Sequence, residues 1–434
     1  MPNRNPASAP RKLQAIAAAC AGACLLGTAL QAVFTAGASA QPRPAALVFK
    51  VNSTKDAPDA HPGDGHCADS AGKCTLRAAL QEADAAPVGA SSTVTVPAGT
   101  YLLSLGTLAV GTATRRSITV TGAGPKLTVI SAGNAFRVMS VAASATVTLH
   151  GLEVTGGNAG SHGYGGGVFS RGKLTLSEDA VDGNKAGAGG GGVVNDSGTL
   201  AVSATHIDHN TTGSLGGGIL GSGPLTVFQA SFDGNHAGRD GGAIDASGTI
   251  TVNRSTLAGN TAGGTLPGEG AAIWLHAGAS LQLVNSTVAN NTTSPATGGA
   301  VDNAGGKVSL SFDTFSDNTG ALKGTGFTAS GTVLAGTGTT PNCTAPVHEP
   351  YGYNLSTDLS CKLAMPTDIP GANPKLSPLA YNGGPTETQA LTPDSPALDA
   401  GGQTSTSHCP ATDERGQTRP FGPACDIGAY ELKY

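Results

Sequence analysis

The sequence predicts an all-β protein wound as a single-stranded, right-handed parallel β-helix with three sheets around a shared interior. Three observations carry this prediction. The 434 residues include 65 Gly and 26 Pro but only 12% charged residues, which argues against an ordinary helical protein. Hydrophobic residues still make up 39% of the chain, which argues against disorder. The third observation is an internal repeat of about 26 residues between residues 150 and 320.

Each repeat contains a pair of apolar residues, then an Asn, and then a Gly-rich segment followed by another apolar residue. The Asn positions lie 26, 25, 25, 31 and 27 residues apart, at Asn184, Asn210, Asn235, Asn260, Asn291 and Asn318. Leucine-rich repeats need several leucines and a helical segment per unit, and propeller blades need about forty residues, so neither fits. Three short strands per repeat fit a β-helix whose coils stack about 4.8 Å apart.

The repeated polar and small residues are expected at corners of the coils. Asn tolerates the left-handed backbone conformation, and its amide can bond to equivalent Asn side chains above and below. The Gly runs at 189–192 and 216–218 are expected at bends that need positive φ or close backbone approach. A phosphate-binding function for these runs is disfavoured, because they recur in every repeat and no helix follows them.

Residues 1–40 are predicted to be an export signal. A basic start precedes an apolar stretch at residues 13–34, and small residues at 38–40 predict cleavage after Ala40. An uncleaved membrane anchor and lipid attachment at Cys24 are the weaker alternatives. Cleavage would change the net charge from −5 to −8, because the segment carries three basic residues and no acidic one. We therefore expect a secreted or cell-surface monomer that is not inserted in a membrane, and no nucleic-acid partner, since Lys and Arg are not clustered.

Six cysteines remain after the export signal. Six allow fifteen connectivities, but their clustering along the chain favours three local disulfides: Cys67 with Cys74, Cys343 with Cys361, and Cys409 with Cys425. The Cys-x-x-Cys spacing of a metal site is absent, so structural disulfides are expected.

The sequence predicts four segments. They are the export signal (1–40), an N-terminal cap (41–92), the β-helix (93–340) and a disulfide-stapled C-terminal cap (341–434). Within the N-terminal cap, Leu76, Ala79, Leu80 and Ala83 form one apolar face of a short helix at residues 76–85. Such a helix would cover the strand edges at the open end of the β-helix.

Motifs at both ends resemble known families. Residues 74–80 (CTLRAAL) resemble the motif of the CSLREA domain, found at the start of secreted bacterial proteins with β-helical repeats, with Thr75 for Ser and Ala78 for Glu. The C-terminal cap resembles the choice-of-anchor Q domain through residues 382–386 (NGGPT), 395–401 (SPALDAG), 413–420 (DERGQTRP) and 425–431 (CDIGAYE). The resemblance implies a secreted, pectin-lyase-like β-helix. That domain usually precedes a surface-anchoring signal, whereas this sequence stops three residues after Glu431, so release, or retention through some other contact, is expected. The acids and arginines of 413–431 are expected to form ion pairs and turn caps.

The strand after each Gly run carries the best candidate site. If its apolar residues point inward, one outward residue per coil follows: Phe169, Val194, Leu220, Asp245, Trp274 and Asp302. Trp274, the only tryptophan, would lie between Asp245 and Asp302, with His276 on the same face and a longer loop at 261–269 before it. Two coils would separate the carboxylates by about 9.6 Å, near the separation in inverting glycosidases. This pattern predicts a carbohydrate-binding surface or, less strongly, a catalytic pair. The alternative is that the acids only keep the surface soluble.

A second outward column contains Asp182, Asp208 and Asp233, two residues before successive repeat Asn residues. Carboxylates about 4.8 Å apart repel one another unless a cation or solvent screens them, and calcium would suit oxygen ligands there. A solvated column without metal is the favoured alternative, and no other cofactor is expected.

Known catalytic motifs are largely missing. Polygalacturonases combine Asn-x-Asp, Asp-Asp, Gly-His-Gly and Arg-x-Lys, and only Arg171-Gly172-Lys173 is present here. No Gly-x-Ser-x-Gly motif supports acyl transfer. The sequence therefore favours a secreted or cell-surface protein for binding or adhesion, in contact with carbohydrate or extracellular matrix. The alternative is a polysaccharide lyase or glycoside hydrolase that acts on an acidic polysaccharide from this outer face.

Overall fold

The computed structural model describes residues 46–113 and 115–434, which belong to the compact unit Arg43–Tyr434. The predicted export signal and its cleavage point lie outside these residues. Within the described part of the chain, no helix is both long enough and apolar enough to span a membrane.

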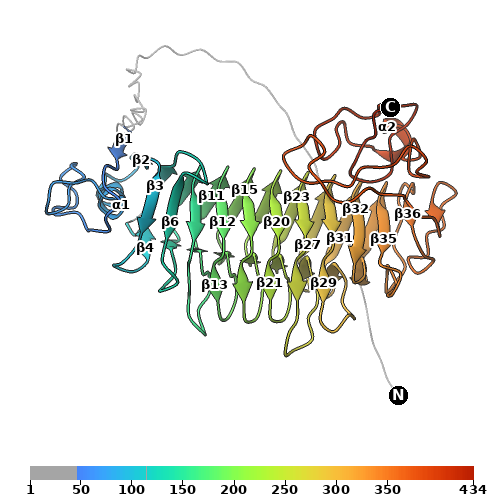
Figure 1. Cartoon of the computed structure of the whole chain (residues 1–434), viewed down its shortest axis with the longest axis horizontal. Coiled ribbons are helices and arrows are strands. Elements are labelled where there is room, and N and C mark those ends of the chain that lie inside the picture. Colours follow the sequence, from blue (N-terminus) through green and yellow to red (C-terminus); the bar gives the residue numbers. More distant parts are fainter. Residues whose placement is uncertain (1–45, 114) are drawn as a thin grey trace, which may run out of the picture. The chain divides into compact units, whose positions relative to one another are not determined.

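Parallel strands stack coil upon coil in three long sheets and one short sheet (Figure 1). The nine-stranded sheet carries the candidate site and contains, in chain order, β4 (Leu108–Val110), β7 (Met139–Val141), β10 (Val168–Ser170), β14 (Val193–Asn195), β18 (Ile219–Gly221), β22 (Ile244–Ala246), β26 (Ile273–Leu275), β30 (Val301–Asn303) and β33 (Leu322–Gly324). The predicted all-β, single-stranded parallel β-helix with three main sheets is confirmed.

The other two long sheets complete each coil. The eleven-stranded sheet contains β1 (Leu47–Lys50), β2 (Ser91–Thr95), β5 (Ser117–Thr121), β8 (Thr146–His150), β11 (Lys173–Ser177), β15 (Thr199–Ser203), β19 (Leu225–Phe228), β23 (Thr249–Asn253), β27 (Ser280–Val284), β31 (Lys307–Ser311) and β34 (Phe327–Ser330). The twelve-stranded sheet contains β3 (Gly99–Leu102), β6 (Thr128–Ser131), β9 (Glu153–Thr155), β12 (Ala180–Asp182), β16 (His206–Asp208), β20 (Ser231–Asp233), β24 (Thr256–Ala258), β28 (Thr287–Ala289), β32 (Thr314–Asn318), β35 (Val333–Gly336), β36 (Leu355–Ser356) and β37 (Ile369–Pro370).

A short fourth sheet was not predicted. It contains two-residue strands that follow the repeat Asn in successive coils: β13 (Lys185–Ala186), β17 (Thr211–Thr212), β21 (His236–Ala237), β25 (Thr261–Ala262) and β29 (Thr292–Thr293). The expected loop at 261–269 therefore starts as a strand. Two residues are too few to show an alternating pattern in the sequence, which is why this sheet was missed.

Apolar residues of the repeat stack inside the β-helix. In the eleven-stranded sheet the register aligns equivalent residues of successive coils, and all of them are buried: Leu174, Leu200, Leu225, Ile250, Leu281 and Val308. Because the strands are parallel and in register, each apolar side chain packs on its equivalents above and below. The repeat thus builds one continuous core.

The predicted Asn column is a buried hydrogen-bonded ladder. From Asn184 to Asn318, each Nδ2 donates to Oδ1 of the next Asn at 2.9–3.1 Å. The expectation that these Asn residues adopt the left-handed conformation is wrong. The residue before each one has positive φ instead, as at Gly183 (65°) and His209 (52°). The turn at that residue lets the Asn side chain point inward, where it bonds to the neighbouring coil.

The N-terminal end is covered as predicted by helix α1 (Leu76–Ala85). The Thr75 side chain accepts a hydrogen bond from the Ala78 N–H at 3.1 Å and caps the helix. The predicted apolar face is buried and packs against β1, β2 and β4. Helix α2 (Thr404–Ser407) lies in the C-terminal region. The three disulfides pair as the clustering of the cysteines predicted.

Residues of the C-terminal region bind the outer face of the twelve-stranded sheet. The buried Glu414 carboxylate accepts hydrogen bonds from Thr256 Oγ1 at 3.0 Å, Thr287 Oγ1 at 2.6 Å and Thr386 Oγ1 at 3.1 Å. Asn285 on the β-helix adds a bond from its Nδ2 to the Thr412 carbonyl at 2.7 Å. These contacts dock the C-terminal region on β24 and β28.

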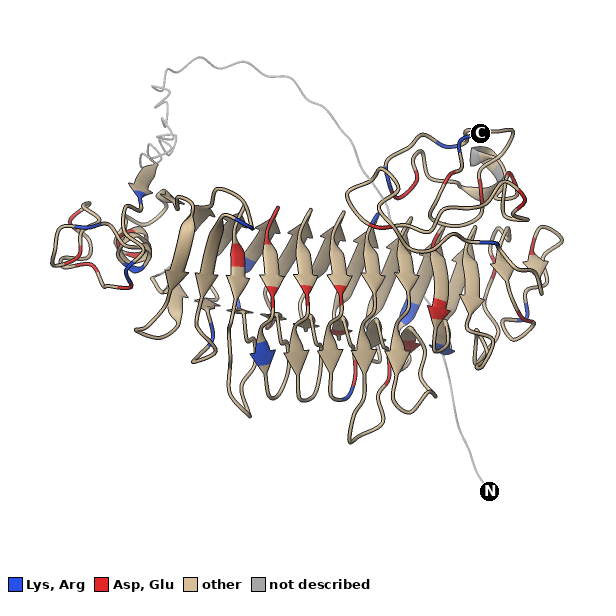
Figure 2. Cartoon of the chain, viewed as in Figure 1, with Lys and Arg blue, Asp and Glu red and all other residues tan. Residues whose placement is uncertain are grey.

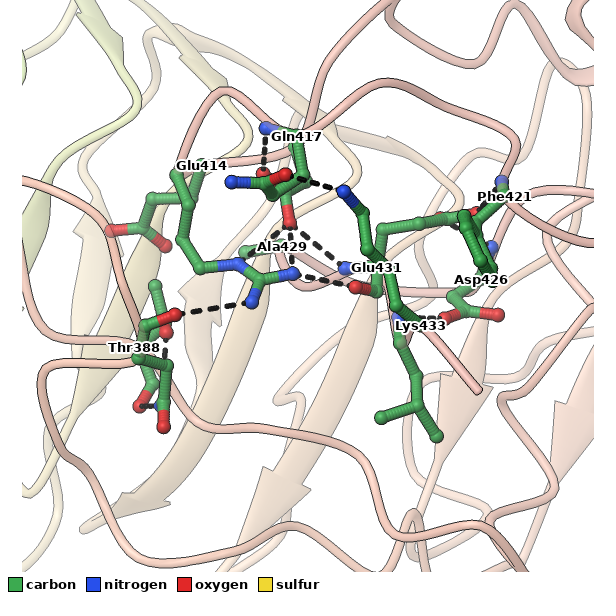
Figure 3. A network of polar contacts seen from close by, with 12 residues as sticks. Thr388, Glu414, Gln417, Phe421, Asp426, Ala429, Glu431 and Lys433 are labelled. Atoms are coloured by element: carbon green, nitrogen blue, oxygen red, sulfur yellow. Dashed lines mark hydrogen bonds and ion pairs between the residues drawn. The ribbon is translucent and has the colours of Figure 1, made fainter.

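Ion pairs and turn caps hold the C-terminal region together, as expected (Figure 3). Glu431 accepts the backbone N–H groups of Phe421 at 2.7 Å and Asp426 at 3.0 Å. Arg415 bonds to Asp413 at 2.7 Å and lies over the Tyr430 ring, 3.6 Å from its centroid. The charged motif residues of this region therefore have structural partners.

Candidate functional site

The residues of the candidate site share one column, as the repeat predicted. The register of the nine-stranded sheet pairs each with its equivalent in the next coil, in the order Phe169, Val194, Leu220, Asp245, Trp274 and Asp302. Residues far apart in the sequence are thereby neighbours on the outer side of one sheet. His276 follows two residues after Trp274 on the same side.

The expected exposure of the two acids is wrong. Asp245 and Asp302 are each 1% exposed, and Trp274 is half-buried. Both acids extend from the outer side of the sheet but are covered by hydrogen-bonding neighbours. Residue type and register predicted the column, whereas burial depends on loops and partners that the repeat does not reveal.

Asp302 is a structural residue. One of its carboxylate oxygens accepts the Gly270 N–H at 2.8 Å and the other accepts the Gly299 N–H at 2.6 Å. Burial raises the pKa of Asp302 to about 7, although these hydrogen bonds oppose the shift. With both oxygens bonded to backbone turns, Asp302 anchors two coils and is not available as the second member of a catalytic pair.

Asp245 has a different environment. Its Oδ1 lies 2.9 Å from His276 Nε2, whereas Oδ2 is buried and has no hydrogen-bond partner among the described residues. Burial raises the pKa of Asp245, and the hydrogen bond to Asp245 raises the pKa of His276. The His276 side chain is 41% exposed. A buried carboxylate therefore orients an accessible imidazole, an arrangement that can move a proton.

A groove of about 490 Å³ lies beside this pair, and we call it the sheet groove. Its apolar lining comes from the outer column and the preceding turns: Phe169, Val194, Leu215 and Leu220. Its polar and aromatic lining includes Tyr164, Arg171, Asn195, Asp196, Ser222, Ser247, Asp245 and His276. The sheet groove thus combines an apolar surface with several hydrogen-bonding groups.

Two arginines flank Phe169 at one end of the sheet groove. Their guanidinium carbons lie 4.9 Å (Arg137) and 5.2 Å (Arg171) from the ring centroid. Arg171 also forms an ion pair with Asp196 at 2.8 Å. Arg137 and Asp196 could not be recognised from the sequence, because their partners lie 25 or more residues away in the chain.

Trp274 lies just beyond the other end. Its ring makes an edge contact with His276, with the centroids 5.9 Å apart. In the inserted segment before β26, Glu269 forms an ion pair with Lys323 at 2.7 Å. The structure therefore brings Asp245, Trp274 and His276 together beside the sheet groove. Asp302 instead binds backbone N–H groups in two turns.

The second predicted column lies on the twelve-stranded sheet, where Asp182 is in register with Asp208. Asp208 Oδ1 accepts the Asp233 N–H at 2.9 Å, which joins the third acid to the column. His209 Nδ1 lies 3.0 Å from Asp182 Oδ1, and this contact raises the pKa of His209. Charged residues are otherwise sparse along the strands (Figure 2).

Across residues 46–113 and 115–434, no group of three or more His, Cys, Asp or Glu side chains has a geometry that could hold a metal ion. The Asp182, Asp208 and Asp233 column is instead balanced in part by histidine. Calcium at this column therefore stays a prediction without support from the side-chain arrangement.

Comparison with known proteins gives a likeness of fold. No protein-family model and no curated protein matches the chain. Among solved structures, the crystal structure of pectate lyase Pel9A is similar, with a TM-score of 0.54 and 15% sequence identity over 90% of this chain and 97% of that chain. The chain therefore has a pectate lyase-like parallel β-helix fold.

Proposed function

We propose that this protein is a secreted carbohydrate-binding β-helix protein that holds a saccharide in the sheet groove and so contacts a cell surface or extracellular matrix. The observation that carries the proposal is the accessible His276, held by the buried Asp245, between the sheet groove and Trp274. Sugar rings present both apolar C–H faces and hydroxyl groups, which suit an indole ring beside hydrogen-bonding side chains.

The dimensions of the sheet groove support this proposal. Its volume of about 490 Å³ is within the range of roughly 300–1,000 Å³ that is usual for ligand pockets. From Phe169 to Asp245 the column climbs three coils, about 14 Å at the usual strand spacing. A short oligosaccharide would fit along the column.

Two further features support an extracellular carbohydrate-related role. Three disulfides are typical of proteins from oxidising compartments. The similar solved structure is that of a pectate lyase, a likeness that favours carbohydrate without deciding between binding and cleavage.

The test is a glycan array followed by calorimetry with wild type, Trp274→Ala and Phe228→Ala. Phe228 is the matched control, because it is an aromatic side chain, 38% exposed, on the eleven-stranded sheet. We expect wild type and Phe228→Ala to bind the same glycans and Trp274→Ala to bind them more weakly. If wild type binds no glycan, the proposal is wrong.

Cleavage of an acidic polysaccharide is the second candidate function. The Asp245–His276 pair favours it, since a carboxylate-bound imidazole can accept or donate a proton during lyase or hydrolase chemistry. Uronate polymers should be incubated with wild type and Asp245→Asn, with and without calcium, and assayed for reducing ends and unsaturated products. If wild type forms product and Asp245→Asn does not, the protein is an enzyme and not only a binding protein. If wild type forms no product, cleavage of the polymers tested is excluded.

A further inference from the structure

We propose that the Asp245–His276 pair hydrolyses an ester that joins an apolar acyl group to a saccharide held in the sheet groove. This inference rests on the proposed carbohydrate-binding function and adds a reaction and a substrate class to it. The residues that carry it lie on the outer side of the nine-stranded sheet and are, in chain order, Phe169, Val194, Leu220, Asp245, Trp274 and His276.

The sheet groove has an apolar half and a polar half. Phe169, Val194 and Leu220 stand in register on three successive coils and form an apolar wall about 10 Å long at the usual strand spacing. Leu215 extends this apolar wall from the segment before β18. The next residue of the column is Asp245, which begins the polar half. The apolar wall offers no hydrogen bond to a sugar hydroxyl group, whereas an acyl group would be removed from water there.

The polar half contains a general base. His276 lies on the coil after Asp245, and its Nε2 is 2.9 Å from Asp245 Oδ1. When Asp245 is ionised, Nε2 carries the proton of this hydrogen bond, because a carboxylate can only accept. That tautomer leaves Nδ1 as an acceptor, and Nδ1 has no hydrogen-bond partner among the described residues. His276 can therefore take a proton from a water molecule.

Trp274 offers a hydrogen-bond donor next to this base. Its ring makes an edge contact with the His276 ring, with the centroids 5.9 Å apart. The indole Nε1–H can only donate, and no described residue accepts from it. Negative charge develops on the carbonyl oxygen of an ester when water attacks, and a donor at that oxygen lowers the barrier. The base and the donor thus lie side by side in the polar half.

The reaction uses water and needs no serine nucleophile. His276 Nδ1 takes a proton from water as the water oxygen attacks the acyl carbon. The tetrahedral intermediate then expels the sugar oxygen, which takes this proton from His276 as its bond to the acyl carbon breaks. The products are a carboxylic acid and a saccharide with a free hydroxyl group, and His276 returns to its starting state.

An ester fits these groups better than a glycosidic bond does. Most glycoside hydrolases use two carboxyl groups that flank the scissile bond. Here both oxygens of Asp302, the other acid of the column, are bonded to backbone N–H groups. Ester hydrolysis needs one base and one donor at the carbonyl oxygen, and His276 and Trp274 supply these. The apolar wall beside them would receive the acyl chain.

The acetyl and hexanoyl esters of methyl glucoside test the substrate class, with release of acid as the measurement. We expect wild type to hydrolyse the hexanoyl ester with a kcat/KM about tenfold above that of the acetyl ester, because the longer chain is buried on the apolar wall. Leu220→Asn should remove this preference. Leu102→Asn is the matched control and should retain it, since Leu102 is an exposed leucine on β3 of the twelve-stranded sheet. Equal kcat/KM values for the two esters in wild type would overturn the apolar wall as the acyl site.

Two variants test the reacting groups. His276→Ala should lower kcat about a hundredfold or more. His209→Ala is the matched control and should leave kcat unchanged, because His209 makes the same kind of contact with Asp182 on another sheet. Trp274→Phe keeps an aromatic ring but deletes the donor, so kcat should fall about a hundredfold while KM changes little. A full rate in His276→Ala would overturn the inference.

Asp245 is a positioning residue, and the pH profile tests it. In wild type, kcat/KM should rise with pH as His276 loses its proton. Asp245 holds the pKa of His276 above its usual value, and Asp240 and Arg239 are the other charged groups close to His276. Asp245→Asn should therefore move the inflection of the profile to lower pH, besides lowering kcat. An inflection that stays in place would overturn the role of Asp245.

A glycan array and nitrophenyl hexanoate, an ester without a sugar, separate this inference from the proposed function. If wild type binds glycans but hydrolyses neither the glucoside esters nor nitrophenyl hexanoate, only the inference is wrong. If wild type binds no glycan and hydrolyses nitrophenyl hexanoate alone, the proposed function has failed, and with it the saccharide part of the inference. Glycan binding together with hydrolysis of the glucoside hexanoate supports both.

Discussion

His276 Nε2 lies 2.9 Å from Oδ1 of Asp245, a buried carboxylate on the preceding coil of the nine-stranded sheet. Asp302 lies in the same column, yet both of its oxygens bond to backbone N–H groups. Two acids that are equivalent in the repeat thus have different roles. One orients an accessible imidazole beside the sheet groove, and the other anchors the coils.

Replacing Asp245 should lower the pKa of His276. In the wild type, the hydrogen bond to Asp245 holds this pKa above the usual value of about 6.5. The pair therefore adds stability below about pH 6.5, and this contribution is lost as the pH rises through the pKa of the folded state. In Asp245→Asn the His276 ring proton shifts, followed by NMR, should titrate at lower pH. The His209 titration is the internal control and should not move, because His209 pairs with Asp182.

Asp302 should affect stability and leave glycan affinity unchanged. Its pKa is raised to about 7 in the folded protein, so its ionisation between about pH 4 and 7 costs folding free energy. Asp302→Asn cannot ionise. The stability of wild type relative to this variant, from urea unfolding, should therefore fall by about 1 kcal/mol per pH unit across that window. A pH-independent difference would contradict the assignment.

The Asn ladder should be a major source of stability. Asn235 Oδ1 accepts from both the backbone N–H and Nδ2 of Asn210, and Asn235 Nδ2 donates to Asn260, so Asn235→Ala leaves the buried Asn210 N–H without its acceptor and removes the side-chain bond to the following coil. We expect a loss of about 3 kcal/mol in the free energy of unfolding, measured in urea. Asn253→Ala is the control, because Asn253 lies outside the ladder on β23, and it should cost less than about 1 kcal/mol. Equal losses of unfolding free energy in Asn235→Ala and Asn253→Ala would mean that a ladder Asn contributes no more stability than an Asn outside the ladder.

The coil architecture could be predicted from the sequence, because the same pattern of apolar residues, Asn and Gly recurs in successive repeats. Leu174, Leu200 and Leu225 lie 26 and 25 residues apart, the same spacings as those of the corresponding repeat Asn residues, and their strands stack in register. The cap helix and the disulfides followed from the apolar spacing and from the clustering of cysteines.

The candidate site was only partly predictable. The column of Asp245, Trp274 and Asp302 followed from the register, but burial and hydrogen-bond partners did not. Whether an outward Asp is exposed depends on loops such as 263–269, whose conformation has no repeat.

Glu414 should control docking of the C-terminal region. Glu414→Leu removes an acceptor for Thr256, Thr287 and Thr386, and of these only the Thr256 hydroxyl retains another hydrogen bond, to the Glu387 carbonyl. We expect faster amide hydrogen exchange across residues 374–434 and a loss of a few kcal/mol in stability. Glu414→Gln retains an acceptor oxygen and should lose less. Unchanged exchange in Glu414→Leu would mean that other contacts hold this region in place.

The most direct test of the account is the fluorescence of Trp274 during titration with a glycan that the array identifies. Trp274 is the only tryptophan in the chain, and it lies against His276 at the edge of the sheet groove. We predict a saturable change in its emission, with the same dissociation constant that calorimetry gives. Saturable binding by calorimetry without any change in Trp274 emission would place the saccharide elsewhere and contradict the account.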